Sequence, residues 1–139
     1  MSVPVRYRSA NKLEAYTKTR EMCVYTLYLC ENQNYFPKKS RWNIANKIIN
    51  DCIDCLGKIV KANKINPRDK EDAKVRTDLQ YDVLLTFDEI WTLMDIASDL
   101  YSIESQKIEK WSSIMLKAEE TVHAWRKANV KGYADLYGD

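Results

Sequence analysis

The sequence contains little glycine or proline, with 3 of each among its 139 residues. Sandwiches and barrels with many strands need such residues at their turns, so an all-β fold is not expected. Long apolar runs are also missing, because the longest stretch without a charged residue is Met22–Cys30. A membrane-spanning helix needs about 20 apolar residues, so no membrane span is expected. The first residues show no secretory signal, and we therefore expect a cytoplasmic location.

Histidine is nearly absent, since His123 is the only one in the sequence. No second histidine is available to activate a serine or cysteine nucleophile. The sequence also lacks a glycine-rich loop for phosphate and the Glu-x-x-His pairs of bundles that hold two metal ions. His123 directly follows Val122, off the main apolar stripe, which is typical of a partly exposed packing residue. We therefore expect a protein that is not an enzyme.

Four cysteines are present, and they lie within apolar periodic segments at Cys23, Cys30, Cys52 and Cys55. Without an export signal, reduced thiols are favoured over disulfides. Cys52 and Cys55 have the spacing of half a zinc site, but zinc-binding pairs usually lie on turns, whereas free cysteine packs as a small apolar residue. We expect no metal and no cofactor. A metal or redox bundle that uses these thiols is a weaker alternative.

Apolar residues make up 45% of the sequence and charged residues 30%, which fits a single packed domain over residues 1–139. The apolar residues recur at steps of three and four, as on one face of a helix. The sequence predicts an all-α protein, an antiparallel up-down four-helix bundle that assembles into a homo-oligomer. The predicted helices cover about 12–33, 38–64, 67–103 and 106–128, and the tails 1–11 and 129–139 are expected to be less ordered.

Each predicted helix has its own apolar stripe. On the first helix Arg20 fills a gap in the stripe, and on the second either Cys55 or Leu56 fits the spacing. The predicted core residues of the first two helices are Leu13, Tyr16, Cys23, Leu27 and Cys30, followed by Ala45, Ile48, Cys52 and Ile59. Those of the last two are Val83, Phe87, Ile90, Met94, Ala97 and Tyr101, followed by Ile108, Trp111, Met115, Ala118, Val122 and Trp125.

Two helix boundaries carry specific expectations. Asn66 can cap the third helix with Pro67 in its first turn. Between the third and fourth helices, residues 102–106 contain no glycine or proline, so one continuous helix of about 60 residues is an alternative. Glu104 would then lie on the apolar stripe, and Ser102 or Ser105 can cap a new helix. A turn is therefore favoured.

A second apolar stripe runs beside the first on the third helix. A helix of a monomeric bundle usually needs one stripe, so we expect the second stripe to form a subunit interface. Its residues are Leu93, Ile96, Leu100 and Ile103. The alternative is a monomer in which these residues widen the contact with the core.

Charge is distributed unevenly along the sequence. Residues 1–70 have a net charge of +8 and residues 71–139 a net charge of −6. Cations in the first half alternate with aromatic residues, as required for binding the phosphates and unpaired bases of single-stranded nucleic acid. Its candidate contacts include Arg20, Lys38, Lys39, Arg41 and Lys47. Carboxylates on the third helix favour a solvated face, or one that docks a basic partner; they are Asp78, Asp82, Asp88, Glu89, Asp95 and Asp99.

Two segments carry a family resemblance. Phe36-Pro37-Lys38-Lys39-Ser40-Arg41-Trp42 and the stretch from Lys110-Trp111 through Glu119 and Val122 to Ala124-Trp125-Arg126-Lys127-Ala128-Asn129 are its motifs. They resemble the four-helix-bundle family that includes the accessory variability determinant of diversity-generating retroelements and the proteins of intervening sequences in bacterial ribosomal RNA genes. Asn43-Ile44-Ala45-Asn46 departs from the ribosomal branch, so the retroelement branch fits better.

The resemblance implies a pentameric barrel of bundles that binds a reverse transcriptase and its template RNA, or an RNA/DNA hybrid. It also implies a non-catalytic role in the synthesis of mutagenised cDNA. Lys38, Lys39 and Arg41, together with Arg126 and Lys127, are the RNA or polymerase contacts that it suggests. The alternative function is a protein-only scaffold that docks a basic partner on the acidic third helix.

Overall fold

The computed structural model describes residues 10–138, which form four α-helices and no strand. The helices are α1 (Ala10–Glu31), α2 (Asn46–Lys64), α3 (Lys70–Leu100) and α4 (Ser105–Tyr137). A short 3-10 helix, η2 (Lys38–Ser40), and a π-helical turn, η3 (Arg41–Ala45), precede α2. The expectation of an all-helical bundle is confirmed. The predicted tail 1–11 lies mostly outside the described residues.

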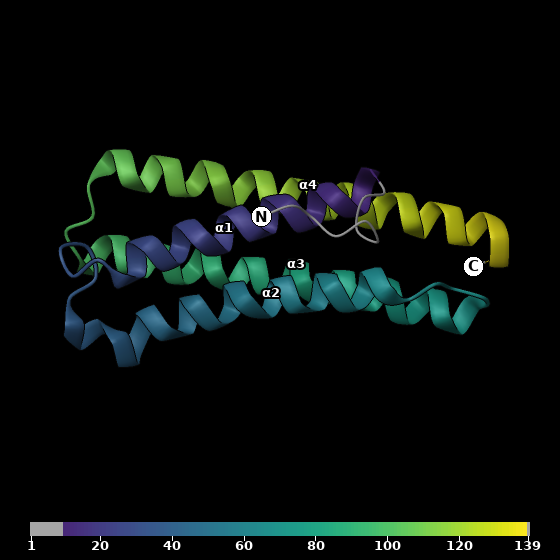
Figure 1. Cartoon of the computed structure of the whole chain (residues 1–139), viewed down its shortest axis with the longest axis horizontal. Helices are drawn as coiled ribbons and strands as arrows, with labels where there is room; N and C mark the ends of the chain where they lie inside the picture. The colour runs from purple at the N-terminus through teal and green to yellow at the C-terminus, as the bar shows by residue number, and fades with distance from the viewer. Residues whose placement is uncertain (1–9, 139) are drawn as a thin grey trace.

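The four helices lie side by side around one core (Figure 1). α1 packs against α2 and α4, and α3 packs against the same two helices. The segments 32–45 and 101–104 lie at one end of the molecule, and the segment 65–69 lies at the other end together with the C-terminus.

The predicted stripes of α2, α3 and α4 form most of this core. Leu56, Tyr101 and Ile108 are half-buried at its edge, and the other predicted residues of these stripes are buried. Phe36 closes one end, where its ring centroid lies 5.6 Å from that of Tyr101 and 6.1 Å from that of Trp111. Helix spacing predicted the positions of Tyr101 and Trp111, but Phe36 lies outside the predicted helices, and its burial was not expected.

The predicted stripe of α1 is partly wrong. Cys23 and Cys30 are buried as expected, but Tyr16 and Leu27 are only half-buried and Arg20 is exposed. The Leu13 side chain lies outside the described part of the chain. The continuous buried line is instead Ala15, Thr19, Met22, Thr26 and Leu29.

The difference on α1 arises because two threonines occupy core positions. The Thr26 hydroxyl accepts a hydrogen bond from the Trp111 indole nitrogen Nε1 at 2.9 Å, inside the core. A buried hydroxyl with such a partner avoids most of the desolvation cost of a polar group. Because these two core residues are polar, the apolar pattern did not identify the face of α1 that packs inward.

The turn between α3 and α4 is present, so the continuous-helix alternative is wrong. α3 ends at Leu100, and Glu104, rather than Ser102 or Ser105, is the N-cap residue of α4. The start of α3 was predicted too early, because its N-cap is Asp69 instead of Asn66. The Asp69 carboxylate accepts a hydrogen bond from the backbone N–H of Asp72 at 2.9 Å.

The C-terminal part of α4 also differs from expectation. Residues 129–137 were predicted as part of a less ordered tail, but α4 continues through them to Tyr137. The Asn129 amide oxygen accepts a hydrogen bond from Gln80 Nε2 at 2.9 Å, and the Tyr137 hydroxyl donates one to the Pro67 carbonyl at 3.3 Å. These contacts with α3 and the segment before it give the extra turns of α4 a surface to pack on.

Candidate nucleic-acid interface

The segment before α2 contains three exposed cations and an exposed indole. Lys38, Lys39 and Arg41 are exposed, and Trp42 has 84% of its surface accessible. We call these four residues the Trp42 cluster. The side chain of Trp42 points away from the core, so its ring is available to a partner.

Local structure explains why these side chains are exposed. The backbone N–H of Ser40 donates to the Pro37 carbonyl at 2.8 Å, which closes the 3-10 turn. The N–H of Asn46 donates to the Arg41 carbonyl, which closes the π turn. Ser40, Ile44 and Ala45 are buried, so the inner side of the segment is anchored while its cations remain in water.

Lys47, unlike these cations, forms ion pairs within the bundle. Its ammonium Nζ lies 3.1 Å from Asp51 Oδ1 and 3.0 Å from Glu89 Oε1, so it links α2 to α3. The pKa of Lys47 is raised. The hydrogen bond that its ammonium donates to Glu89 is the largest cause, and the one that it donates to Asp51 is the next. Two carboxylates already compensate its charge, which makes it a poorer phosphate ligand than the sequence suggested.

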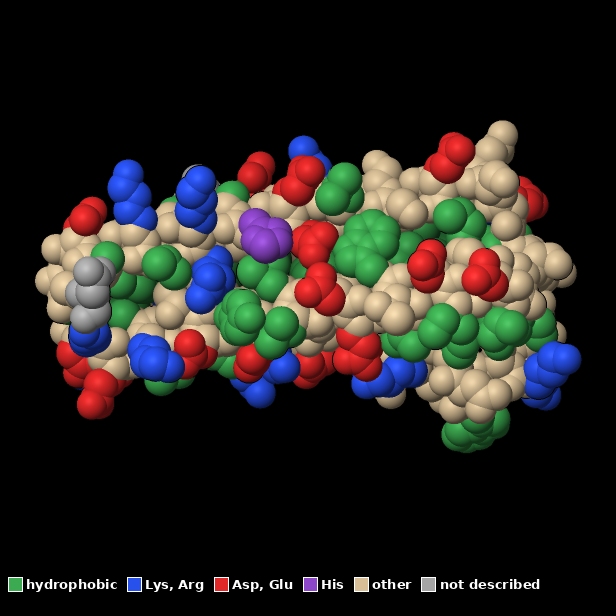
Figure 2. Space-filling model, turned by 180° about the vertical axis from the view of Figure 1, so that it is seen from behind, with side chains coloured by type: hydrophobic (Ala, Val, Ile, Leu, Met, Phe, Trp, Pro, Cys, Tyr) green, Lys and Arg blue, Asp and Glu red, His purple; other side chains and the backbone are tan. Residues whose placement is uncertain are grey.

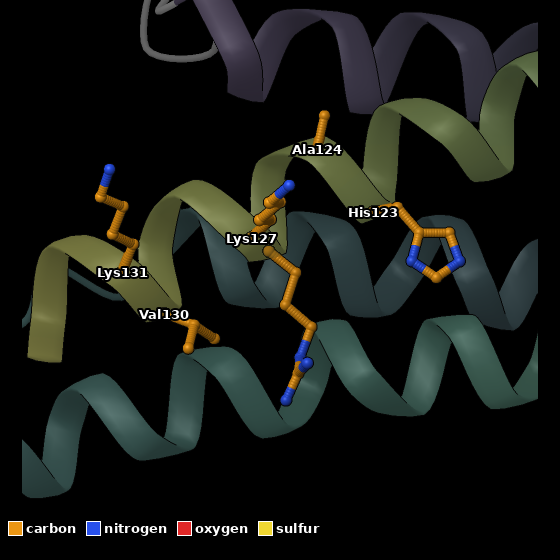
Figure 3. Close-up of a pocket in the computed structure, with 6 residues that line it drawn as sticks. His123, Ala124, Lys127, Val130 and Lys131 are labelled. Atoms are coloured by element: carbon orange, nitrogen blue, oxygen red, sulfur yellow. The ribbon is translucent and has the colours of Figure 1, made fainter. Parts of the chain in front are cut away.

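Arg126 and Lys127 lie on α4 and differ in environment. Arg126 is half-buried, with Nε donating to the Thr77 carbonyl at 3.2 Å and the guanidinium 5.1 Å from the Tyr81 ring centroid. It therefore ties α4 to α3. Lys127 is exposed and lies along α4 between His123 and Lys131, beside a shallow hollow of about 460 Å³ (Figure 3).

Arg20 lies apart from the other sequence-predicted contacts. It lines a groove between α1 and α4 together with Tyr25, Tyr28, Lys107 and Lys110. The sequence analysis missed both lysines and both tyrosines. Their shared spacing of three residues, which places each pair on one face of its helix, was the available signal.

The predicted interface stripe is divided between core and surface. Leu93 and Ile103 are half-buried against the core, whereas Ile96 and Leu100 are 42% and 63% exposed. Leu85, also on α3, is exposed as well. Figure 2 shows that apolar side chains and carboxylates are interspersed on the face seen from behind.

Several carboxylates on α3 have no ion-pair partner within the described residues. Asp88, Asp95 and Asp99 are exposed and form none of the ion pairs found there. Asp78 pairs with Lys74 at 2.7 Å. This face of α3 is therefore acidic and exposed.

The four cysteines are unpaired and buried, as predicted. The Cys23 thiol donates to the Cys52 carbonyl at 3.1 Å, between α1 and α2. Burial raises the pKa of Cys23 to about 11 and that of Cys30 to about 12, so these thiols stay protonated at neutral pH. His123 is exposed. Within residues 10–138 no group of three or more His, Cys, Asp or Glu side chains has a geometry that holds a metal ion.

No family model, no curated protein and no solved structure matches the chain. None of the helices in the described residues is long and apolar enough to cross a membrane.

Proposed function

We propose that this protein is a non-catalytic, RNA-binding accessory subunit of the reverse transcriptase of a diversity-generating retroelement. The observation that carries the proposal is the Trp42 cluster, in which three exposed cations and an exposed indole lie within the one short segment 38–42. Cations neutralise phosphates and release counterions, and an aromatic face stacks on an unpaired base. The retroelement setting is supported by the two motifs that resemble that family.

The first motif divides naturally between core and surface. Phe36 packs in the core, while Lys38, Lys39 and Arg41 remain exposed. The second motif does the same, since Trp111 and Trp125 are buried and Lys127 is exposed. In this proposal the bundle is antiparallel and up-down and forms a homo-oligomer, a pentameric barrel by resemblance, so that each copy adds a cluster to one summed positive field.

The test is to reverse the three charges of the cluster together in Lys38→Glu, Lys39→Glu and Arg41→Glu. Loss of about three phosphate contacts should weaken RNA binding about a hundredfold at about 0.1 M salt. Synthesis of cDNA by the partner polymerase should fall with it. RNA affinity is measured by fluorescence anisotropy and cDNA by primer extension.

The matched control reverses three exposed cations near the other end of α2, in Lys61→Glu, Lys64→Glu and Arg68→Glu. It makes the same change in net charge. Equal losses in the two triple variants would mean that total charge, and not the Trp42 cluster, determines RNA binding.

The acidic face of α3 supports a second candidate function, a protein-only scaffold that docks a basic partner. Asp88, Asp95 and Asp99 have no ion-pair partner in the described structure, so a basic surface would relieve their mutual repulsion. A purified protein that fails to bind RNA at low salt, but whose binding to the polymerase is lost in Asp88→Asn, Asp95→Asn and Asp99→Asn together, would favour the scaffold.

A further inference from the structure

A groove of about 550 Å³ lies between α1 and α4, and it contains none of the residues of the Trp42 cluster. The α1 side contributes one cation and two tyrosines, and the α4 side contributes two lysines. The lining residues are Arg20, Glu21, Val24, Tyr25, Tyr28, Lys107, Lys110 and Ile114.

The lysines and tyrosines of the groove form two cation-π pairs. Lys107 Nζ lies 5.6 Å from the ring centroid of Tyr28, and Lys110 Nζ lies 5.1 Å from that of Tyr25. The two ring centroids are 5.9 Å apart, with 40° between their planes. Each ammonium is therefore held beside an aromatic surface and within reach of the same ligand.

The charge of the groove is not compensated internally. Arg20, Lys107 and Lys110 form none of the ion pairs found among the described residues. Glu21 is the only carboxylate in the lining, and its Oε2 lies 3.6 Å from the ammonium of Lys18. The groove therefore has an excess of positive charge and attracts an anionic ligand.

The walls of the groove also offer flat and apolar surface. Tyr28 is 50% exposed and Val24 is 54% exposed, while Ile114 is half-buried beside them. A tyrosine face stacks on any base, and the adjacent cations bind the phosphates that flank it. In a duplex the bases are already stacked inside, so only an unpaired strand can use both features.

We propose that the α1/α4 groove binds a single-stranded segment of nucleic acid, with a base stacked on Tyr28 and phosphates on Arg20, Lys107 and Lys110. This inference rests on the proposed RNA-binding function and adds a second site that selects unpaired strands. The Trp42 cluster and the groove would then hold different parts of one RNA.

The experiment measures binding of the full-length protein to a short unstructured RNA, to the same strand in a duplex, and to the same strand without bases. The single strand should bind at least about tenfold more tightly than the other two. Tyr28→Ala should lose about tenfold in affinity for the single strand alone, and Tyr28→Phe should keep it within about twofold. The logarithm of the RNA binding constant falls linearly with the logarithm of the salt concentration. Lys107→Gln and Lys110→Gln should each make this slope less steep by about 0.7.

Two matched controls separate local from general effects. Ile53→Ala removes a half-exposed apolar side chain from α2, and Lys61→Gln with Lys64→Gln removes two exposed charges from the same helix. Both should bind the single strand like the unchanged protein, and circular dichroism checks that every variant is folded.

The possible failures are distinguishable. If the unchanged protein binds RNA and only the variants of the Trp42 cluster lose affinity, the groove is not a site and the proposed function stands. If the unchanged protein binds no RNA, both proposals fall. If Lys110→Gln changes the mass in light scattering and leaves RNA affinity unchanged, the groove contacts a second copy of the chain, which overturns the inference.

Discussion

At the scale of single residues, Asp51 shows how burial and pairing oppose each other. Only 6% of its surface is exposed, and its Oδ2 is buried without a hydrogen-bond partner in the described structure. Its Oδ1 accepts a hydrogen bond from Lys47 Nζ at 3.1 Å. Burial raises the pKa of Asp51, and the hydrogen bond from Lys47 lowers it by less. The raised pKa is the direction we expect, because one carboxylate oxygen is cut off from water.

This pKa shift predicts how stability depends on pH. The folded chain binds the Asp51 proton more tightly than the unfolded chain, so ionisation of Asp51 favours unfolding. Its stabilising contribution is complete below the ordinary pKa of 3.8 and is lost as pH rises through the raised folded value. The unfolding free energy of the unchanged protein minus that of Asp51→Asn should therefore fall with pH across this window and then level off.

Urea unfolding at a series of pH values measures this difference. The matched control is Asp54→Asn, which removes an exposed carboxylate that pairs with Lys58 at 3.1 Å. Exposed pairs contribute little, so Asp54→Asn should change stability by less than about 1 kcal/mol. A difference between the unchanged protein and Asp51→Asn that rises with pH would show that pairing with Lys47 outweighs burial.

At the scale of helices, the spacing of apolar side chains was sufficient to predict the buried faces of α2, α3 and α4. Their stripes contain residues such as Phe87, Trp111 and Trp125, and all three are buried. The stripe of α1 could not be found in this way, because Thr19 and Thr26 are polar by type and buried by context. The hydrogen bond between Thr26 and Trp111 joins residues far apart in the sequence, so helix periodicity does not contain it.

The C-terminal turns of α4 were also missed because contacts between helices decide them. Gly132 favours a helix end by its intrinsic propensity, but the surrounding turns pack on α3. Tertiary contact therefore overrides a weak local preference.

Removal of one of these contacts gives a prediction for the C-terminal turns of α4. Asn129→Ala should leave the amide of Gln80, which is fully buried, without its partner at 2.9 Å. An unpaired buried amide costs about 1–3 kcal/mol of unfolding free energy. Thermal and urea unfolding measure the loss. Lys131→Ala, an exposed position on the same helix, should change stability by less than about 0.5 kcal/mol, and an equal effect of both changes would mean that the Gln80–Asn129 contact adds no stability.

At the scale of the whole molecule, part of the candidate site could be predicted from sequence. The cations of the Trp42 cluster are adjacent in the chain, so their common exposure needs only one anchored segment. Spacing could pair Tyr25 with Tyr28 and Lys107 with Lys110, but the groove itself could not be predicted, because its two sides come together only through the packing of α1 on α4. Lys47 shows the converse. Its partner Glu89 comes from another helix and compensates a positive charge that looked unpaired in the sequence.

The proposed assembly into a homo-oligomer can be tested on the exposed apolar side chains of α3. Ile96 and Leu100 are exposed on α3, and apolar side chains of this size gain about 25 cal/mol for each Å² of surface that a second copy covers. In the proposed homo-oligomer, Ile96→Glu with Leu100→Glu should reduce the mass in light scattering to that of one 16.3 kDa chain, with the helical content unchanged. Leu116→Glu places a single glutamate at a half-exposed position on α4 and should leave the mass unchanged. If the unchanged protein already has the mass of a single chain, these residues only border the core of a monomer, and the summed field of several copies is not available for RNA binding.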